Sequence, residues 1–200
     1  MSKKLWKASH KMKIHSNLYR FEQFIGKKFN FKVSKNYNKI LKWSIENSKD
    51  FWSSIWDFTS VVGEKKNKFK ITKNLLNSKY FLNSKLNFAE NLLPKRNNDK
   101  AITFISENGF KEIRTWKELN NNVSYIQSFF KKLNLKPKNR VAAYMPNIIE
   151  TVEFFLATSS LGSIWSSCSP DFGTDGVIER FSQIKPKVLI ICDRYYYNGK

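Results

Sequence analysis

The sequence predicts an α/β fold, in which a helical N-terminal cap precedes the first strands and helices of a parallel sheet. Three observations support this prediction. Residues 1–97 place apolar side chains at helical spacing and mix aromatic residues with Lys and Asn. Residues 98–200 alternate strand-like and helical patterns, which is typical of a parallel sheet with helical crossovers. The chain ends just after a strand-like pattern, so we expect an incomplete sheet and a truncated chain.

The first part, residues 1–97, is expected to hold three helices. Apolar side chains recur every three or four positions in 17–29 and again in 36–46. Ser48 is placed to cap a third helix, because a hydroxyl can accept a hydrogen bond from a free backbone N–H in the first turn. We expect three tryptophans of this region to be buried against the α/β part, namely Trp43, Trp52 and Trp56.

The second part, residues 98–200, begins with a predicted hairpin. Two strand-like segments, 101–106 and 110–115, flank Asn108-Gly109, a pair that favours a tight turn. Thr115 and Glu118 have the spacing of a capping box, which predicts a helix through residue 133. Strand, helix, strand, helix and strand follow, with Gly162 ending the first of these helices; the predicted ranges are 140–145, 148–161, 164–168, 175–184 and 187–192.

The net charge of +20 is the first clue to function, and its distribution weakens it. Residues 1–100 carry 23 Lys and Arg against 7 Asp and Glu, whereas residues 101–200 carry 13 against 9. The basic residues are 30 Lys and 6 Arg, although Arg makes the bidentate contacts that recognise phosphates and guanine. We expect a solvated Lys-rich surface and no nucleic-acid partner. A single-strand nucleic-acid-binding module built on residues 1–96 stays open as the alternative from another class.

Cysteine and histidine usage supports neither a disulfide framework nor a metal site. Cys168 and Cys192 form no C-x-x-C pair and are expected to be inert buried thiols. His10 and His15 lie in a polar arm and are expected at the surface. The longest apolar stretch, 152–165, is too short and too polar to span a bilayer, and we expect a cytoplasmic protein without a membrane partner.

None of the seven glycines has the spacing of a glycine-rich phosphate-binding motif. Gly173 and Gly176 flank Thr174-Asp175 at the start of a predicted helix and could expose N–H groups to an anion, but a tight turn that leads into the helix is the favoured interpretation. The run 165–173, Trp-Ser-Ser-Cys-Ser-Pro-Asp-Phe-Gly, follows a predicted strand at the edge where open α/β sheets bind ligands. Spacing alone makes it a loop at a binding edge and assigns no catalytic residue.

The same run resembles acetoacetyl-CoA synthetases, a branch of the AMP-forming acyl-CoA synthetases. Residues 86–93, Leu-Asn-Phe-Ala-Glu-Asn-Leu-Leu, are similar to a signature that this branch shares with acetyl- and propionyl-CoA synthetases. Further similarities occur in the expected order over nearly the whole chain; they include Leu5-Trp6, 43–46, 51–52, 56–58, Pro146-Asn147, 157–162, 183–184 and 186–188. The 165–173 run points to the acetoacetyl branch, and acetyl- or propionyl-CoA synthetase stays open as the alternative.

The resemblance implies an acid–thiol ligase of lipid metabolism with small-molecule partners: acetoacetate, ATP and CoA. Acetoacetate would attack the α-phosphate of ATP, and the CoA thiol would then displace AMP, with Mg²⁺ neutralising the pyrophosphate. Residues 98–200 would be the start of an AMP-binding domain, a parallel α/β nucleotide-binding lobe. The phosphate loop and the catalytic Lys of the family have no match in 1–200, so we expect this chain alone to be inactive.

What the resemblance assigns to this chain is part of a CoA site. The turn Ser169-Pro170-Asp171 matches a segment that lies near CoA in related synthetases. Lys200 falls nearest a basic position that meets the CoA phosphates. Tyr196 or Tyr197 stands where some relatives have Arg, so one phosphate contact is in doubt.

Overall fold

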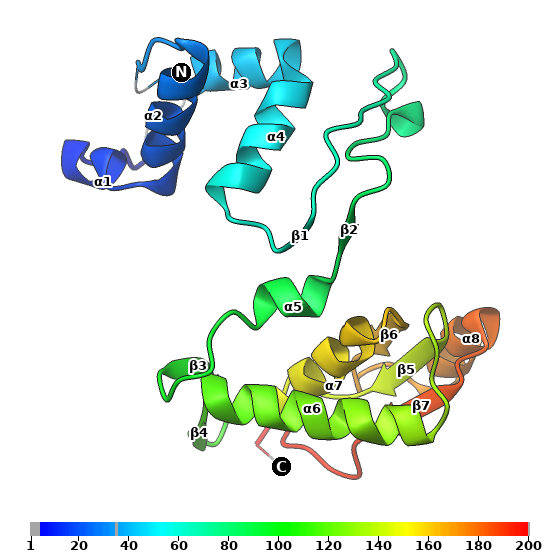
Figure 1. Cartoon of the computed structure of the whole chain (residues 1–200). Helices are drawn as coiled ribbons and strands as arrows, with labels where there is room; N and C mark the ends of the chain where they lie inside the picture. Colours follow the sequence, from blue (N-terminus) through cyan, green and yellow to red (C-terminus); the bar gives the residue numbers. More distant parts are fainter. Residues whose placement is uncertain (1–4, 35, 200) are drawn as a thin grey trace. The chain divides into compact units, whose positions relative to one another are not determined.

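The computed structural model of the chain describes residues 5–34 and 36–199, apart from the side chain of Leu75. The chain forms two compact units, Met1–Lys85 and Leu86–Lys200, called unit 1 and unit 2 below (Figure 1). The domain boundary placed at residue 97 from the sequence falls inside unit 2, and the assignment of domains stays a prediction.

Helices dominate the chain up to the end of unit 1. The elements are α1 (His10–Ile14), α2 (Asn17–Phe29), α3 (Tyr37–Glu46), α4 (Ser48–Phe58), β1 (Gly63–Glu64), the 3-10 helix η1 (Leu75–Asn77) and β2 (Lys85–Leu86). The three predicted helices are confirmed as α2, α3 and α4, whereas the single-turn helix α1 was not predicted.

The predicted cap at Ser48 is wrong, because α4 begins at Ser48 itself. Asn47 precedes it and makes no side-chain capping bond to α4. Its side chain turns back instead, and Asn47 Nδ2 donates to the carbonyl of Trp43 at 3.2 Å. One residue therefore separates two helices, and its amide satisfies the end of α3 rather than the start of α4.

Aromatic rings pack against one another in the core of unit 1. Phe21 is buried, and its ring centroid lies 5.8 Å from that of Phe51 and 5.3 Å from that of Phe58. The predicted burial of the tryptophans holds only in part: Trp56 is 9% exposed, Trp43 is half-buried, and Trp52 is 44% exposed. Their packing against the α/β part stays a prediction. Trp52 lies at the rim of the aromatic cluster, with its ring 6.0 Å from Tyr80, so one face stays open to solvent.

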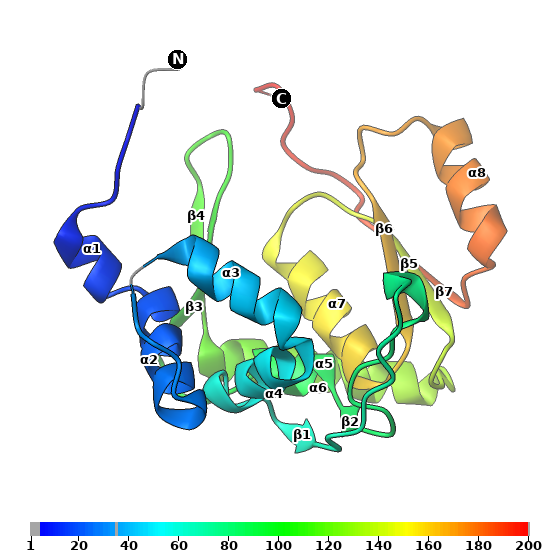
Figure 2. The same cartoon turned by 90° about the horizontal axis from the view of Figure 1, so that it is seen from above.

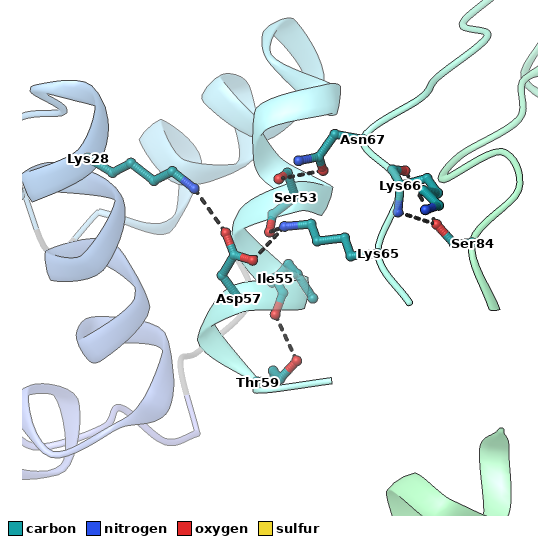
Figure 3. A network of polar contacts seen from close by, with 9 residues as sticks. All are labelled: Lys28, Ser53, Ile55, Asp57, Thr59, Lys65, Lys66, Asn67 and Ser84. Atoms are coloured by element: carbon teal, nitrogen blue, oxygen red, sulfur yellow. Dashed lines mark hydrogen bonds and ion pairs between the residues drawn. The ribbon is translucent and has the colours of Figure 1, made fainter. Parts of the chain in front are cut away.

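A carboxylate with two lysine partners ties the elements of unit 1 together (Figure 3). Asp57 of α4 accepts hydrogen bonds from Lys28 of α2 at 3.0 Å and from Lys65, in the segment after β1, at 2.5 Å. Lys65 also donates to the carbonyl of Ser53 at 3.1 Å. Asp57 and its two lysine partners come from three separate segments, so Asp57 fixes α2 and the segment after β1 onto α4.

Unit 2 alternates strands and helices. Its elements are α5 (Phe88–Leu92), β3 (Lys100–Ile105), β4 (Lys111–Thr115), α6 (Trp116–Lys132), β5 (Arg140–Tyr144), α7 (Ile149–Ser160), β6 (Ile164–Cys168), α8 (Thr174–Ile184) and β7 (Val188–Ile191). The predicted hairpin, capping box and strand–helix alternation are confirmed. Gly162 has φ +66° just after α7, a conformation that favours glycine and ends the helix. The short helix α5 was not predicted.

The three strands β6, β5 and β7 form the parallel sheet that the sequence pattern predicts, in the order β6-β5-β7. Alternate residues face opposite sides, so Val141 and Val188 pack in the core under α6 and α7. Ala142, Tyr144 and Cys168 face α8 and pack with Phe181. Figure 2 shows α7 and α8 on opposite sides of these strands.

Candidate functional site

The carboxyl ends of the three parallel strands meet at one edge of the sheet. Tyr144, the last residue of β5, is in register with Cys168 of β6 and with Ile191 of β7. The segments 145–148, 169–173 and 192–199 therefore leave the sheet at the same edge. Open α/β sheets bind ligands at this edge, so the segment 169–173, called the β6–α8 loop below, lies where a ligand is expected.

Hydrogen bonds inside the β6–α8 loop shape it into a turn. Ser169 Oγ donates to Asp171 Oδ2 at 2.7 Å, and the amide of Asp171 lies 3.4 Å from Ser169 Oγ. The amide of Phe172 donates to the carbonyl of Ser169 at 3.2 Å. Ser169 and Asp171 are exposed and Pro170 is half-buried, so the turn presents a hydroxyl and a carboxylate to solvent.

Two further elements hold the β6–α8 loop. The Tyr144 hydroxyl lies 2.8 Å from the carbonyl oxygen of Pro170 and 2.8 Å from that of Phe172. From α8, the Arg180 guanidinium lies 4.4 Å from the centre of the Phe172 ring, within cation–π range. Neither Tyr144 nor Arg180 was identified from the sequence, because each lies many residues from the loop segment that it contacts.

The segment after β7 brings three tyrosines to the same edge. Tyr195, Tyr196 and Tyr197 are all exposed, and the rings of Tyr195 and Tyr197 lie 6.3 Å apart. Partial desolvation, followed by the negative charge of Asp171, raises the pKa of the Tyr195 phenol. Lys200, the predicted phosphate contact, lies outside the described residues.

A cavity of about 640 Å³ opens beside these segments, within unit 2. Three walls enclose it: the tip of the β3–β4 hairpin, the segment after β5, and residues Cys192 and 194–196 after β7. Gly199 reinforces the hairpin wall, since its amide donates to Glu107 Oε2 at 3.2 Å. Ser169, Pro170 and Asp171 do not line this cavity, so the predicted site residues and the cavity share one sheet edge without sharing walls.

The two glycines singled out in the sequence lie at the start of α8, directly after the turn at residues 170–171. Gly173 is the N-cap residue of α8, and no side chain caps the helix there. A β-carbon added at Gly173 would meet no atom within 4 Å, whereas Gly176 lies inside α8 against the Phe172 ring.

The thiols differ in burial. Cys168 is buried, as predicted, whereas Cys192 is half-buried and its Sγ donates to the carbonyl of Arg194 at 2.9 Å. Within residues 5–34 and 36–199, no group of three or more His, Cys, Asp or Glu side chains is placed to hold a metal ion.

The parallel sheet, its edge loops and the crossover helices form an open α/β domain, and comparison with known proteins defines its class. Residues 91–199, more than half of the chain, match the family described as AMP-binding enzyme. The chain belongs to this family.

The individual relatives belong to one part of this family, the acyl-CoA synthetases. The chain is 39% identical over 197 residues to an acetoacetyl-coenzyme A synthetase of Rhizobium meliloti (strain 1021). The aligned region covers 98% of this chain and 30% of that synthetase. It is 41% identical over 170 residues to an acetoacetyl-CoA synthetase of Xenopus tropicalis, and the aligned region covers 82% of this chain and 25% of that synthetase. A malonamoyl-CoA synthetase of Penicillium aethiopicum is 32% identical, covering 98% and 28%.

Solved structures agree with these relatives. The fold matches an acetoacetyl-CoA synthetase from Streptomyces lividans with a TM-score of 0.93 and 27% identity, over 100% of this chain and 31% of that one. The resemblance and the fold class inferred from the sequence are confirmed. The chain spans about 30% of the length of the first relatives that it matches. In the described part of the chain, no helix is both long enough and apolar enough to cross a membrane.

Proposed function

We propose that this chain is the N-terminal part of an AMP-forming acetoacetate–CoA ligase. The observation that carries the proposal is the 39% identity to the Rhizobium meliloti acetoacetyl-coenzyme A synthetase, sustained over 98% of the chain. The 0.93 TM-score to a solved synthetase supports it independently. A cytoplasmic location belongs to the same proposal.

The proposed reaction joins acetoacetate, ATP and CoA in two steps. A carboxylate oxygen attacks the α-phosphorus of ATP, the bond to the β-phosphate oxygen breaks, and pyrophosphate leaves. The CoA thiol then loses its proton and attacks the acyl carbon of acetoacetyl-AMP, so that AMP leaves with the electron pair of the broken bond. The products are acetoacetyl-CoA, AMP and pyrophosphate.

This chain supplies binding rather than bond-making groups in that proposal. Ser169, Pro170 and Asp171 would contact CoA at the carboxyl edge of the sheet, and Lys200 would meet its phosphates. We assign no catalytic residue within 1–200. The described residues offer no cluster for a metal ion, so the Mg²⁺ expected to accompany ATP and pyrophosphate has no ligand set here, and no step is derived through it.

The acyl group is assigned from the relatives. Acetyl- or propionyl-CoA synthetase stays the alternative, because the amino-terminal signature 86–93 is shared with those enzymes. The malonamoyl-CoA synthetase at 32% identity is a relative whose name carries yet another acid. Acetoacetate is favoured because the Rhizobium meliloti and Xenopus tropicalis relatives, at 39% and 41% identity, are both acetoacetyl-CoA synthetases.

A nucleic-acid-binding module is disfavoured by the packing of unit 1. Base stacking on such a module needs aromatic faces that are free beside lysines. In unit 1 the Trp56 ring lies 4.9 Å from that of Phe81, and Phe69 lies 5.0 Å from Phe81. These rings pack on one another, so the proposed partners remain acetoacetate, ATP and CoA, without nucleic acid or membrane.

A chimaera tests the proposal. This chain would replace the matching amino-terminal 30% of the Rhizobium meliloti synthetase, and AMP formation would be measured with acetoacetate, acetate and propionate in turn. We expect AMP formation that depends on CoA and is fastest with acetoacetate. A folded chimaera that releases no AMP, or that prefers acetate, contradicts the proposal. The 200-residue chain alone is the control, and we expect it to form no acetoacetyl-AMP.

A further inference from the structure

Tyr144 joins the centre of the parallel sheet to the β6–α8 loop. It is the last residue of β5, the middle strand, and its ring packs in the small cluster of Ala142, Cys168 and Phe181. Its hydroxyl reaches beyond this cluster to the carbonyl oxygens of Pro170 and Phe172, at 2.8 Å from each. A phenol has one proton to donate, so the hydroxyl bonds to either carbonyl or is shared between them.

The loop that these bonds hold has few other constraints toward the sheet. Its internal bonds, Ser169 to Asp171 and Phe172 to Ser169, set the local turn but do not fix where the turn lies. The Arg180 guanidinium restrains the Phe172 ring from the α8 side. Tyr144 therefore acts on the loop from the sheet, and Arg180 acts on it from the helix.

We propose that Tyr144 is a positioning residue, whose hydroxyl holds the Ser169–Asp171 turn in place for a ligand at the carboxyl edge of the sheet. The ligand class is the phosphorylated thiol CoA, so this part rests on the proposed function. The ring of Tyr144 serves the packing of the core, and the hydroxyl serves the loop. Removing only the hydroxyl separates the two roles.

The composition of the loop explains why a side chain outside it is needed to hold it in place. Pro170 donates no backbone hydrogen bond, and the exposed Gly173 has no side chain to anchor it, so few contacts made within the loop hold it in place. A hydroxyl on the rigid central strand supplies a donor whose position is set by strand pairing on both sides. Pre-ordering a loop in this way lowers the entropy lost when a ligand binds.

The test compares Tyr144→Phe with wild type by three measurements. The first two use this chain, and the third uses the chimaera with the Rhizobium meliloti synthetase, because this chain is expected to hold only part of the CoA site. Hydrogen exchange of the amides of residues 171–174 reports loop order, the thermal midpoint reports global stability, and titration with CoA reports binding. We expect loop exchange and the dissociation constant for CoA each to rise about tenfold, as one lost hydrogen bond allows. The thermal midpoint should stay close to wild type, because the ring and its packing are kept.

Tyr125→Phe is the matched control. Tyr125 lies on α6 and is 74% exposed, so the same chemical change there should leave all three measurements unchanged. Arg180→Met, at an exposed position of α8, is a second variant that keeps the proposal testable if Tyr144→Phe folds poorly. We expect it to raise loop exchange in the same direction, through loss of the contact with Phe172.

Each outcome separates the positioning role from the proposed function. Unchanged loop exchange in Tyr144→Phe overturns the positioning role, and so does faster exchange with unchanged CoA affinity. If the chimaera that carries the wild-type sequence fails to bind CoA, the CoA contact in the proposed function is wrong, and the exchange of residues 171–174 alone then decides whether the hydroxyl positions the loop. A thermal midpoint that falls in parallel with the exchange would assign Tyr144 to core stability instead.

Discussion

Asp57 shows at the scale of single residues how a Lys-rich surface is used for structure. Hydrogen bonding from Lys65, the largest influence, lowers the pKa of the Asp57 carboxyl, with Lys28 adding to the effect. The carboxylate is about one-third exposed, so solvent screens part of the attraction. Two of the lysines that make the sequence so basic are therefore held inside unit 1 by one acid, as Figure 3 shows.

We predict that Asp57→Asn destabilises the chain by about 1 kcal/mol at pH 7, after allowance for screening. A lowered pKa means that the contribution is present above the unfolded-state value of about 3.9 and is lost as the pH falls through the folded value. The difference between variant and wild type should therefore shrink at about pH 3. Urea unfolding at both pH values checks this.

Glu46→Gln is the control for Asp57→Asn. Glu46 makes an exposed pair with Lys42 at 3.8 Å on the surface of α3, and its loss should cost less than about 0.5 kcal/mol at either pH. Equal effects of the two substitutions would mean that the Asp57 contacts add nothing beyond an ordinary surface pair.

Arg114 and Glu153 of unit 2 form an ion pair that is more buried than the Asp57 pairs of unit 1. Arg114 Nε lies 2.9 Å from Glu153 Oε1, and Arg114 Nη2 also lies 3.0 Å from Glu112 and 3.7 Å from Glu150. Asn122 donates to Glu153 at 2.8 Å. Burial is the largest influence on Glu153 and raises the pKa of its carboxyl, against the opposing effects of Asn122 and Arg114.

We predict unequal costs for removing the two partners. Arg114→Met leaves Glu153 buried without its cation and should cost about 3 kcal/mol at pH 7. Glu153→Gln leaves Arg114 with Glu112 and Glu150 and should cost about 1 kcal/mol or less. Denaturant unfolding of both variants measures the two costs, and a larger cost for Glu153→Gln would contradict the interpretation.

The sign of the pH dependence provides a separate prediction for Glu153. Because its folded-state pKa is raised, the folded chain binds this proton more tightly than the unfolded chain does. The stability contribution is present below the unfolded value of about 4.3 and is lost as the pH rises through the folded value. Relative to wild type, Glu153→Gln should thus become more stable between about pH 4 and pH 7, measured by urea unfolding across that range.

At the scale of elements, the start of α6 is the clearest case of a local signal that sets structure. Thr115 Oγ1 accepts from the Glu118 amide at 3.2 Å, and the Thr115 amide donates to Glu118 Oε2 at 2.8 Å. The bonds that Glu118 accepts from Thr115, the backbone one first, lower the pKa of the Glu118 carboxyl. The capping box closes two free N–H groups where β4 turns directly into α6.

We predict that Thr115→Ala destabilises the chain by about 1 kcal/mol, the usual cost of losing an N-cap oxygen. Ser128→Ala is the matched control, because Ser128 lies within the same helix and its hydroxyl donates to the carbonyl of Ser124, one turn before it. It should be neutral or slightly stabilising, since alanine favours the helix interior. Urea midpoints that move equally for both variants would contradict a capping role.

Sequence patterns were sufficient for elements whose signals are local. The capping box at Thr115, the glycine after α7 and the alternating apolar strands all act within a few residues, so their elements were predicted closely. The single turns α1 and α5 were missed, because five residues are too few to show a helical period. Ser48 failed as a cap because Asn47 serves α3 from the only residue between two helices.

The location of the candidate site could be predicted from the sequence, but the residues that hold the β6–α8 loop could not. The position of the β6–α8 loop directly after a predicted strand of a parallel sheet located it at the binding edge, and the family resemblance suggested its ligand. Tyr144 and Arg180 could not be found this way, because their contacts with the loop depend on strand register and on how α8 packs. The cavity beside the hairpin depends likewise on how β3 and β4 lie against the segments after β5 and β7.

At the scale of the whole chain, one face of unit 2 is left apolar and open. β7 is an edge strand, and two of its side chains on the α8 face, Leu189 and Ile191, are 56% and 66% exposed. A groove of about 500 Å³ runs beside them, lined by Val177, Ile178, Phe181, Ser182, Lys185, Pro186 and Leu189. An edge strand with exposed apolar side chains is a template for association.

We predict that the purified chain self-associates through this face, and that Ile191→Lys raises the concentration at which association begins by about tenfold, because it places a charge on the edge strand. Ile45→Lys is the matched control: Ile45 is 70% exposed on α3, and the substitution adds the same charge to a chain that is already strongly basic. Sedimentation velocity over a concentration series distinguishes the two.

If both variants shift association equally, charge repulsion alone explains the result, and the β7 face is not the contact. If only Ile191→Lys shifts it, the open apolar face drives association, since burial of apolar area is the term that a local charge opposes.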